Sequence, residues 1–151
     1  MKLRALSFAV LLVFSITAVA ADTDRKHIVL QRAPQASALP FSEGVLVGNT
    51  LYIAGHIGID PNTGKPGASA EDEAKLVMDG IKQTVEAGGL SMDDLVSVQV
   101  FCSDVANYDA FNAVYRTYFH GEYPARAFLG SGKLLFGARY EVMGIAVKPQ
   151  K

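Results

Sequence analysis

The sequence predicts a single α+β domain, in which two helices pack on one face of a mixed β-sheet. Several short segments are apolar and rich in valine and isoleucine, which is typical of strands. Two other segments repeat apolar residues at helical spacing. Turn signals rich in glycine and proline separate these segments. The 151 residues, half of them apolar, suit one packed domain of common size.

The first twenty residues have the composition of an export signal. Lys2 and Arg4 precede an uncharged apolar run that closes on Ala18-Val19-Ala20, a small-x-small cleavage pattern. The run is short for a transmembrane helix, which needs roughly 20 apolar residues, so an uncleaved anchor is the weaker alternative. We therefore expect a signal peptide over residues 1–20 and a domain over residues 21–151. The mature protein is then periplasmic or secreted, with no membrane attachment after cleavage.

The domain is expected to begin with a tight β-hairpin. Strands at residues 45–47 and 51–54 flank Gly48-Asn49-Thr50, a turn signal between apolar runs. A loop over residues 60–67 follows, because its prolines and glycines preset or permit turn dihedrals.

Two helices are expected next. Ser69 can cap the first helix, acidic residues fill its first turn, and Gly88-Gly89 ends it. Asn107 is the expected cap of the second helix, which ends near Gly121. The apolar stripes are Ala74, Val77, Met78, Ile81 and Val85 in the first helix, and Phe111, Val114, Tyr115 and Tyr118 in the second.

Two further strands are expected, at residues 95–102 and 139–147. In the first of them the residues expected to share one face are Val96, Val98, Val100 and Cys102. Cys102 is therefore expected to be a buried, inert thiol. As the only cysteine, it excludes an internal disulfide and any multi-cysteine metal site.

Two charged residues break the pattern around them. Glu141 shares its strand face with Met143, Ile145 and Val147, where a carboxylate costs several kcal/mol unless it is paired or solvated. Arg126 follows a proline and enters an apolar stretch, where a guanidinium could bind a carboxylate through two hydrogen bonds. The alternatives are a solvent-exposed strand face for Glu141 and a surface or structural ion pair for Arg126.

Composition and motifs exclude several other functions. The net charge is −1, so the basic footprint of a duplex nucleic-acid binder is absent. The three histidines have no metal-binding spacing, and Gly130-Ser131-Gly132-Lys133 lacks the Ser/Thr of a phosphate loop. We expect no metal, no cofactor and no nucleic-acid partner.

Four segments together resemble the RidA family, also called YjgF: residues 46–60, 111–115, 123–126 and 140–142. The resemblance spans roughly residues 38–148 and implies a chorismate-mutase-like fold and a homotrimer with three clefts between subunits. It also implies hydrolysis of reactive 2-enamino and 2-imino acids to 2-keto acids and ammonia. Arg126 matches the family's carboxylate-binding arginine, and Glu141 matches the glutamate that positions the attacking water.

The resemblance also assigns substrate-binding positions, several of which depart from the family. Asn112, Ser42 and the Gly55 backbone are expected to line the pocket. Three further pocket positions are changed: Phe41 replaces a usual tyrosine, His56 a glutamine, and Phe128 a small residue or cysteine. These changes leave a second reading open, a non-catalytic trimer that binds small carboxylates or acts as a chaperone-like protein.

Overall fold

The structure, a computed structural model, describes residues 24–30 and 39–149. The expected signal peptide over residues 1–20 lies outside the described residues. Within the described ranges, none of the helices has the length and apolar character that a membrane crossing requires.

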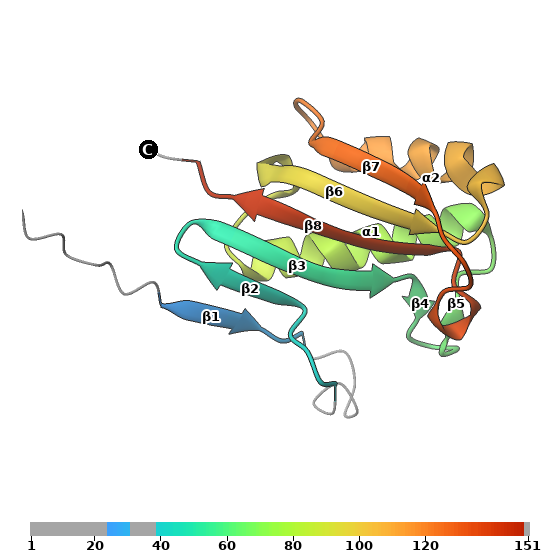
Figure 1. The fold of residues 1–151 in the computed structure, drawn as a ribbon, viewed down its shortest axis with the longest axis horizontal. Helices are drawn as coiled ribbons and strands as arrows, with labels where there is room; N and C mark the ends of the chain where they lie inside the picture. Colours follow the sequence, from blue (N-terminus) through green and yellow to red (C-terminus); the bar gives the residue numbers. More distant parts are fainter. Residues whose placement is uncertain (1–23, 31–38, 150–151) are drawn as a thin grey trace, which may run out of the picture.

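The core of the fold is a six-stranded mixed sheet with the spatial order β1-β2-β3-β8-β6-β7 (Figure 1). Neighbouring strands pair antiparallel, except for the parallel pair β6 and β7. A small ribbon of β4 and β5 follows β3. The strands are β1 (Arg25–Ile28), β2 (Gly44–Val47), β3 (Thr50–Ile57), β4 (Ile59–Asp60), β5 (Lys65–Pro66), β6 (Leu95–Cys102), β7 (Ala125–Gly130) and β8 (Tyr140–Val147).

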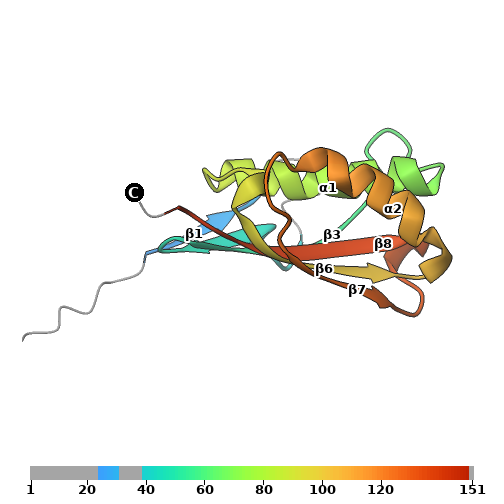
Figure 2. The same cartoon turned by 90° about the horizontal axis from the view of Figure 1, so that it is seen from above.

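Helices α1 (Ala70–Ala87) and α2 (Tyr108–Tyr115) both lie on one face of this sheet (Figure 2). The Ser69 hydroxyl accepts a hydrogen bond from the Asp72 backbone N–H at 3.0 Å, and the predicted apolar stripe of α1 is buried against the sheet. The predicted α+β class, hairpin and helix-covered sheet face are therefore confirmed. Gly48, at φ 57°, makes the hairpin turn in the left-handed region that favours glycine.

Three local predictions were wrong, and two strands were missed. A register shift between Leu95 and Ser97 leaves Val96 exposed, so Val96 does not share the buried face of Val98, Val100 and Cys102. Asn107 makes no side-chain cap, and Asp104 instead accepts from the Ala106 N–H at 3.0 Å. The α-helix ends at Tyr115 and continues only as a 3₁₀ turn over Arg116–Tyr118. The edge strands β1 and β7 were not predicted.

The two faces of the sheet differ in what covers them. One face of the sheet and the two helices enclose the hydrophobic core. Cys102 lies in this core, so its predicted burial is confirmed. The opposite, helix-free face carries Tyr52, Phe101, Leu129, Glu141 and Met143, as the strand register shows. Tyr52, Leu129 and Met143 are exposed on it. This division decides where each candidate functional residue lies.

Candidate functional site

Arg126 lies on edge strand β7 and turns its guanidinium toward helix α2. Its Nη2 donates a hydrogen bond to Asn112 Oδ1 at 2.7 Å, and Asn112 is itself buried. The guanidinium carbon lies 4.5 Å from the centre of the Tyr115 ring, in the range of a cation–π contact. Among the described residues, no carboxylate lies within salt-bridge distance of Arg126. Its remaining N–H groups can therefore bind an anionic ligand.

Glu141 lies on strand β8 with its carboxylate directly over the backbone of Gly55 in β3. A methyl group at Gly55 would overlap the Glu141 carboxylate oxygen, so the absence of a side chain there is what admits this carboxylate. The register of β3 on β8 shifts between Ile53 and His56, next to Gly55. Bulges of this kind re-aim side chains and are frequent beside active sites.

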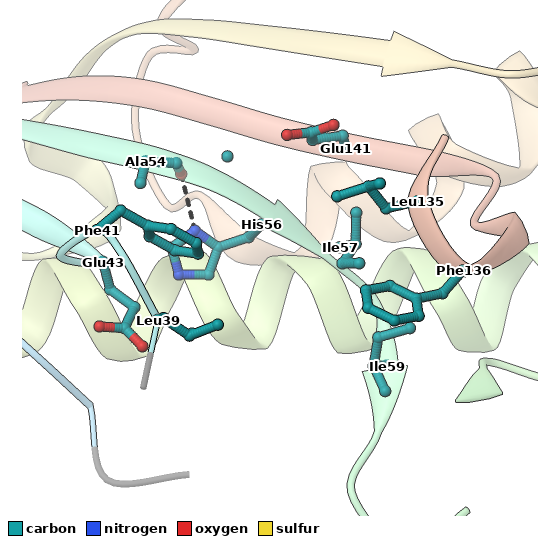
Figure 3. A pocket seen from close by; sticks show the side chains of 11 residues that line it. Leu39, Phe41, Glu43, Ala54, His56, Ile57, Ile59, Leu135, Phe136 and Glu141 are labelled. Carbon is teal, nitrogen blue, oxygen red and sulfur yellow. Dashed lines mark hydrogen bonds between the residues drawn. The ribbon is translucent and has the colours of Figure 1, made fainter. Parts of the chain in front are cut away.

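A cavity of about 490 Å³ opens beside Glu141 (Figure 3). Its volume lies in the range of small-molecule sites, and its walls are mostly apolar. Loops before β2 and before β8 form two of those walls, and β3 runs along the cavity between them. The lining residues are Leu39, Phe41, Glu43, Ala54, Gly55, His56, Ile57, Ile59, Leu135, Phe136 and Glu141.

Arg126 and Glu141 point to opposite faces of the sheet within one chain. Arg126 is the register partner of Val98, which is buried on the helix side. Glu141 is the register partner of Phe101, which lies on the helix-free side. Side chains of paired residues share a face, so the sheet itself separates the guanidinium from the carboxylate. A small ligand cannot touch both groups of the same chain.

The chain is similar in sequence to proteins of a known family. Residues 30–148 match the family described as Endoribonuclease L-PSP. The rat 2-iminobutanoate/2-iminopropanoate deaminase is 37% identical over 126 residues, which cover 82% of this chain and 90% of the relative. The human protein of that name is 34% identical with the same coverage of both chains.

Solved structures agree with the sequence relatives. Escherichia coli TdcF with bound serine superposes with a TM-score of 0.75 at 33% identity, covering 82% of this chain and 99% of the other. RidA from a Psychrobacter species gives a TM-score of 0.74 at 32% identity, again covering 82% and 99%. The chain belongs to the RidA family. The predicted membership and the RidA-type fold are thereby confirmed.

The residues that the RidA resemblance singled out fall into two groups. Arg126, Asn112 and Phe128 form one group at α2 and β7, where the Phe128 ring packs edge-on against Tyr108 at 4.9 Å between centroids. Glu141, Gly55, Phe41 and His56 form the other group around the cavity. Ser42 joins neither group, because its hydroxyl pairs with His27 Nδ1 at 3.0 Å and it does not line the cavity.

The strand expected at residues 51–54 extends further in the structure and includes His56. His56 lies inside β3 and is buried. Its Nδ1 is 2.8 Å from the Ala54 carbonyl oxygen, and its Nε2 is 3.0 Å from the Thr84 hydroxyl on α1. The ring therefore links β3 to the helix layer while one side of it lines the cavity.

Four residues that line the cavity or contact Arg126 were not identified as candidates from the sequence. Glu43 is buried, lines the cavity, and accepts a hydrogen bond from the Leu30 N–H at 3.2 Å. Tyr115 was assigned only to the core, yet it also supports Arg126. Leu135 and Phe136 form an exposed wall of the cavity. The uninterrupted apolar run Leu134-Leu135-Phe136 inside a loop was the signal available for the last two.

Tyr115 carries an ionisable hydroxyl, and its ring lies under the Arg126 guanidinium. Burial raises the pKa of its hydroxyl to about 12, with the positive charge of Arg126 lowering it in part. The phenol is therefore neutral at physiological pH and does not compete with a ligand anion for Arg126.

Within residues 24–30 and 39–149, no cluster of histidine, cysteine and acidic side chains is arranged to hold a metal ion.

Proposed function

We propose that this protein hydrolyses reactive 2-enamino and 2-imino acids to 2-keto acids and ammonia. The observation that carries the proposal is the guanidinium of Arg126, which is fixed by Asn112 and Tyr115 and has no salt-bridge partner among the described residues. Relatives 34% to 37% identical to this chain are named as deaminases of such imines. The TdcF structure holds serine, a molecule with the carboxylate that Arg126 would bind.

Arg126 would bind the substrate carboxylate through two parallel N–H···O hydrogen bonds. The planar fork of a guanidinium matches a carboxylate, and the charge on both partners strengthens the bonds. Because Asn112 already fixes Nη2 and the Tyr115 ring supports the plane, the side chain loses little freedom on binding. The bound carboxylate then sets the position of the adjacent imine carbon.

Glu141 would activate the attacking water. The carboxylate accepts a proton from water as the water oxygen bonds to the imine carbon, and it passes that proton to the imine nitrogen. The tetrahedral adduct then carries a hydroxyl and an amino group on one carbon. Its hydroxyl proton moves to the nitrogen through the same carboxylate, the C–N bond breaks, and ammonia leaves as the C–O bond becomes a carbonyl. An imine carbon is already electrophilic, so this path requires neither a covalent nucleophile nor a metal ion. Holding water and imine together makes the attack effectively unimolecular.

The complete site would form between two copies of the chain, in a homotrimer. One copy would supply Arg126 and its neighbour Glu141, because the sheet separates these residues within a chain. The exposed apolar side chains of the helix-free face, among them Tyr52, Leu129 and Met143, favour contact with another copy. Light scattering that finds a monomer at micromolar concentration would contradict this assembly.

Substitutions of the two charged residues should fail in different ways. Arg126→Lys keeps the charge but loses the fork, so calorimetry should show much weaker binding of 2-keto acids. Glu141→Gln keeps the shape and removes the base, so imine hydrolysis should fall by about 10²–10⁴-fold while binding largely survives. Arg116→Lys and Glu122→Gln change exposed residues outside the site and serve as matched controls.

Two outcomes would overturn parts of this proposal. If Glu141→Gln hydrolyses imines as fast as the unaltered protein, Glu141 is structural and the mechanism fails. If the unaltered protein binds 2-keto acids but never releases ammonia from freshly generated imines, the non-catalytic binder is the correct function. The changed pocket residues Phe41, His56 and Phe128 are the observation that favours this second candidate.

We also infer export of the protein with cleavage after Ala20. The support is the basic start, the apolar run and the Ala18-Val19-Ala20 pattern of the sequence. Intact-mass analysis of the exported protein should find Ala21 or Asp22 as the first residue. Retention of Met1 would show instead that the segment is an uncleaved anchor.

A further inference from the structure

The cavity beside Glu141 is larger and more apolar than a short substrate side chain needs. It encloses about 490 Å³. Away from Glu141, six apolar side chains supply most of its wall: Leu39, Phe41, Ile57, Ile59, Leu135 and Phe136. The methyl group of an alanine-derived imine would leave nearly all of this surface in contact with water.

Phe136 occupies an unfavourable position in two independent respects. Its backbone lies in the left-handed region, at φ 57° and ψ 14°, which a bulky residue rarely adopts. Its side chain is 74% exposed, and that of the adjacent Leu135 is 69% exposed. Packing within the chain therefore does not compensate for the backbone strain. Residues with strained backbones cluster at binding and catalytic sites.

The position of Glu141 indicates what would cover these side chains. In Figure 3, Glu141 lies on one side of the cavity, with Leu135 and Phe136 on the loop next to it. The reacting carbon of a 2-imino acid bears three groups: the carboxylate, the imine nitrogen and the side chain. With the carboxylate on Arg126 and the imine carbon at Glu141, the remaining space for the side chain is this apolar cavity.

We propose that the site selects 2-imino acids with bulky apolar side chains, branched aliphatic or aromatic, over those derived from alanine. This inference rests on the proposed function and names its substrate class. Each methylene placed in an apolar pocket improves discrimination by about 10-fold or more, so several carbons give a large preference. Leu135 and Phe136 would be the residues that determine specificity, because they form the exposed loop wall.

The test compares kcat/KM for two imines generated in situ by an amino-acid oxidase, one from leucine and one from alanine. The unaltered protein should prefer the leucine-derived imine by about 10-fold or more. Phe136→Asn removes the ring, and asparagine is one of the residues that adopt the left-handed backbone readily. The ratio of kcat/KM for the leucine-derived imine to that for the alanine-derived imine should therefore fall by about 10-fold. Phe136→Leu keeps an apolar wall and should retain most of the preference. Val105→Asn, at an exposed residue outside the cavity, should leave the ratio unchanged.

The outcomes separate this inference from the proposed function. If both imines are hydrolysed with equal kcat/KM, or the ratio survives Phe136→Asn, the specificity inference fails and the deaminase function stands. If neither imine is hydrolysed, the function fails, and calorimetry then compares 4-methyl-2-oxopentanoate with pyruvate. Tighter binding of the branched keto acid supports the cavity assignment, and equal binding overturns it. Dissociation of the assembly by Phe136→Asn also overturns it, because the ring is then a subunit contact.

Discussion

At the scale of single residues, the support of Arg126 is as important as its charge. The Tyr115 ring lies 4.5 Å below the guanidinium carbon, and such cation–π contacts contribute roughly 0.5–2 kcal/mol. Asn112 fixes rotation about the last bonds through its 2.7 Å hydrogen bond. The guanidinium is therefore oriented before a ligand arrives, which lowers the entropy cost of binding.

Removal of the Tyr115 hydroxyl should stabilise the protein. The side chain is 4% exposed, and its hydroxyl has no hydrogen-bond partner among the described residues. A buried hydroxyl without a partner costs about 1–3 kcal/mol, so Tyr115→Phe should raise the free energy of unfolding by about 1 kcal/mol. Urea denaturation at neutral pH measures this change. A loss of stability would mean that the assembled protein supplies a partner for the hydroxyl.

The same variant should change the response of stability to alkaline pH. The pKa of Tyr115 is raised to about 12 in the folded protein, so the folded state retains a proton that the unfolded state loses above about pH 10. The contribution of this group is complete below about pH 10 and is lost as pH rises toward 12. Urea denaturation at pH 8 and pH 11 should therefore show a smaller alkaline loss for Tyr115→Phe.

A methyl group at Gly55 should disable the site without unfolding the domain. The added carbon would overlap the Glu141 carboxylate, which must then move. Displacing a catalytic group by about 1 Å can lower the rate by about 10²-fold, so imine hydrolysis by Gly55→Ala should fall by at least that factor. Gly121→Ala is the matched control, because a Cβ there meets no atom within 4 Å. Full activity of Gly55→Ala would show that the placement of Glu141 is not critical.

The candidate site was predictable where a charge interrupted an apolar pattern. Arg126 and Glu141 were both visible in this way, and the family resemblance then gave them roles. Glu43 gave no such signal, because a lone acid before a strand is ordinary in a sequence. Its burial depends on the Leu30 N–H, which approaches it only after β1 and β2 have paired.

At the scale of elements, the interior strands were predictable and the edge strands were not. Strands β6 and β8 are rich in apolar residues, and buried positions recur along them with a spacing of two over most of their length because one face of each is buried. Strand β1 carries Arg25, Lys26 and His27 in four residues, and β7 begins after a proline, as edge strands tolerate. An edge strand has fewer apolar neighbours, so its composition carries less of the periodic signal.

The buried carboxylate of Glu73 links helix α1 to the start of β8 through hydrogen bonds. Glu73 is fully buried and accepts hydrogen bonds from the backbone N–H groups of Arg139 and Tyr140, at 2.5 and 3.0 Å. Its other oxygen lies 2.7 Å from Arg139 Nη1. Because β8 begins at Tyr140, this contact also fixes the strand position of Glu141. These contacts satisfy the buried carboxylate, so we assign Glu73 a structural role.

Loss of the Glu73 carboxylate should destabilise the domain strongly. Glu73→Ala leaves the backbone N–H groups of Arg139 and Tyr140 without their acceptor, whereas the Arg139 guanidinium keeps the Gly67 carbonyl. A buried donor left without a partner costs about 1–3 kcal/mol, so the free energy of unfolding should fall by about 2–6 kcal/mol. Glu71→Ala, at an exposed residue of the same first turn, should cost less than about 1 kcal/mol. Chemical denaturation of both variants provides the comparison. Similar losses for the two would show that the contact contributes little.

At the scale of the whole molecule, one chain does not bring Arg126 and Glu141 together. Its helix-covered face presents Arg126 at one edge, and its helix-free face presents Glu141 beside the cavity. Sequence periodicity places Glu141 among apolar neighbours but cannot tell whether solvent or another copy covers that face. The strand register adds a fact that periodicity does not contain: the two charged groups lie on opposite sides of one sheet.

A site shared between copies should be restored by mixing two inactive variants. Arg126→Lys and Glu141→Gln each remove one member of the pair from every cleft of their own homotrimer. If the two proteins are dissociated in denaturant and refolded together in equal amounts, random assembly of a cyclic trimer places an intact Arg126 opposite an intact Glu141 in about one quarter of all clefts in the sample. Imine hydrolysis should then recover to about one quarter of the original rate, whereas each variant refolded alone should stay inactive. If one chain supplied both residues, no mixture could contain an intact site, and the activity of the mixed sample would remain at the level of the separate variants.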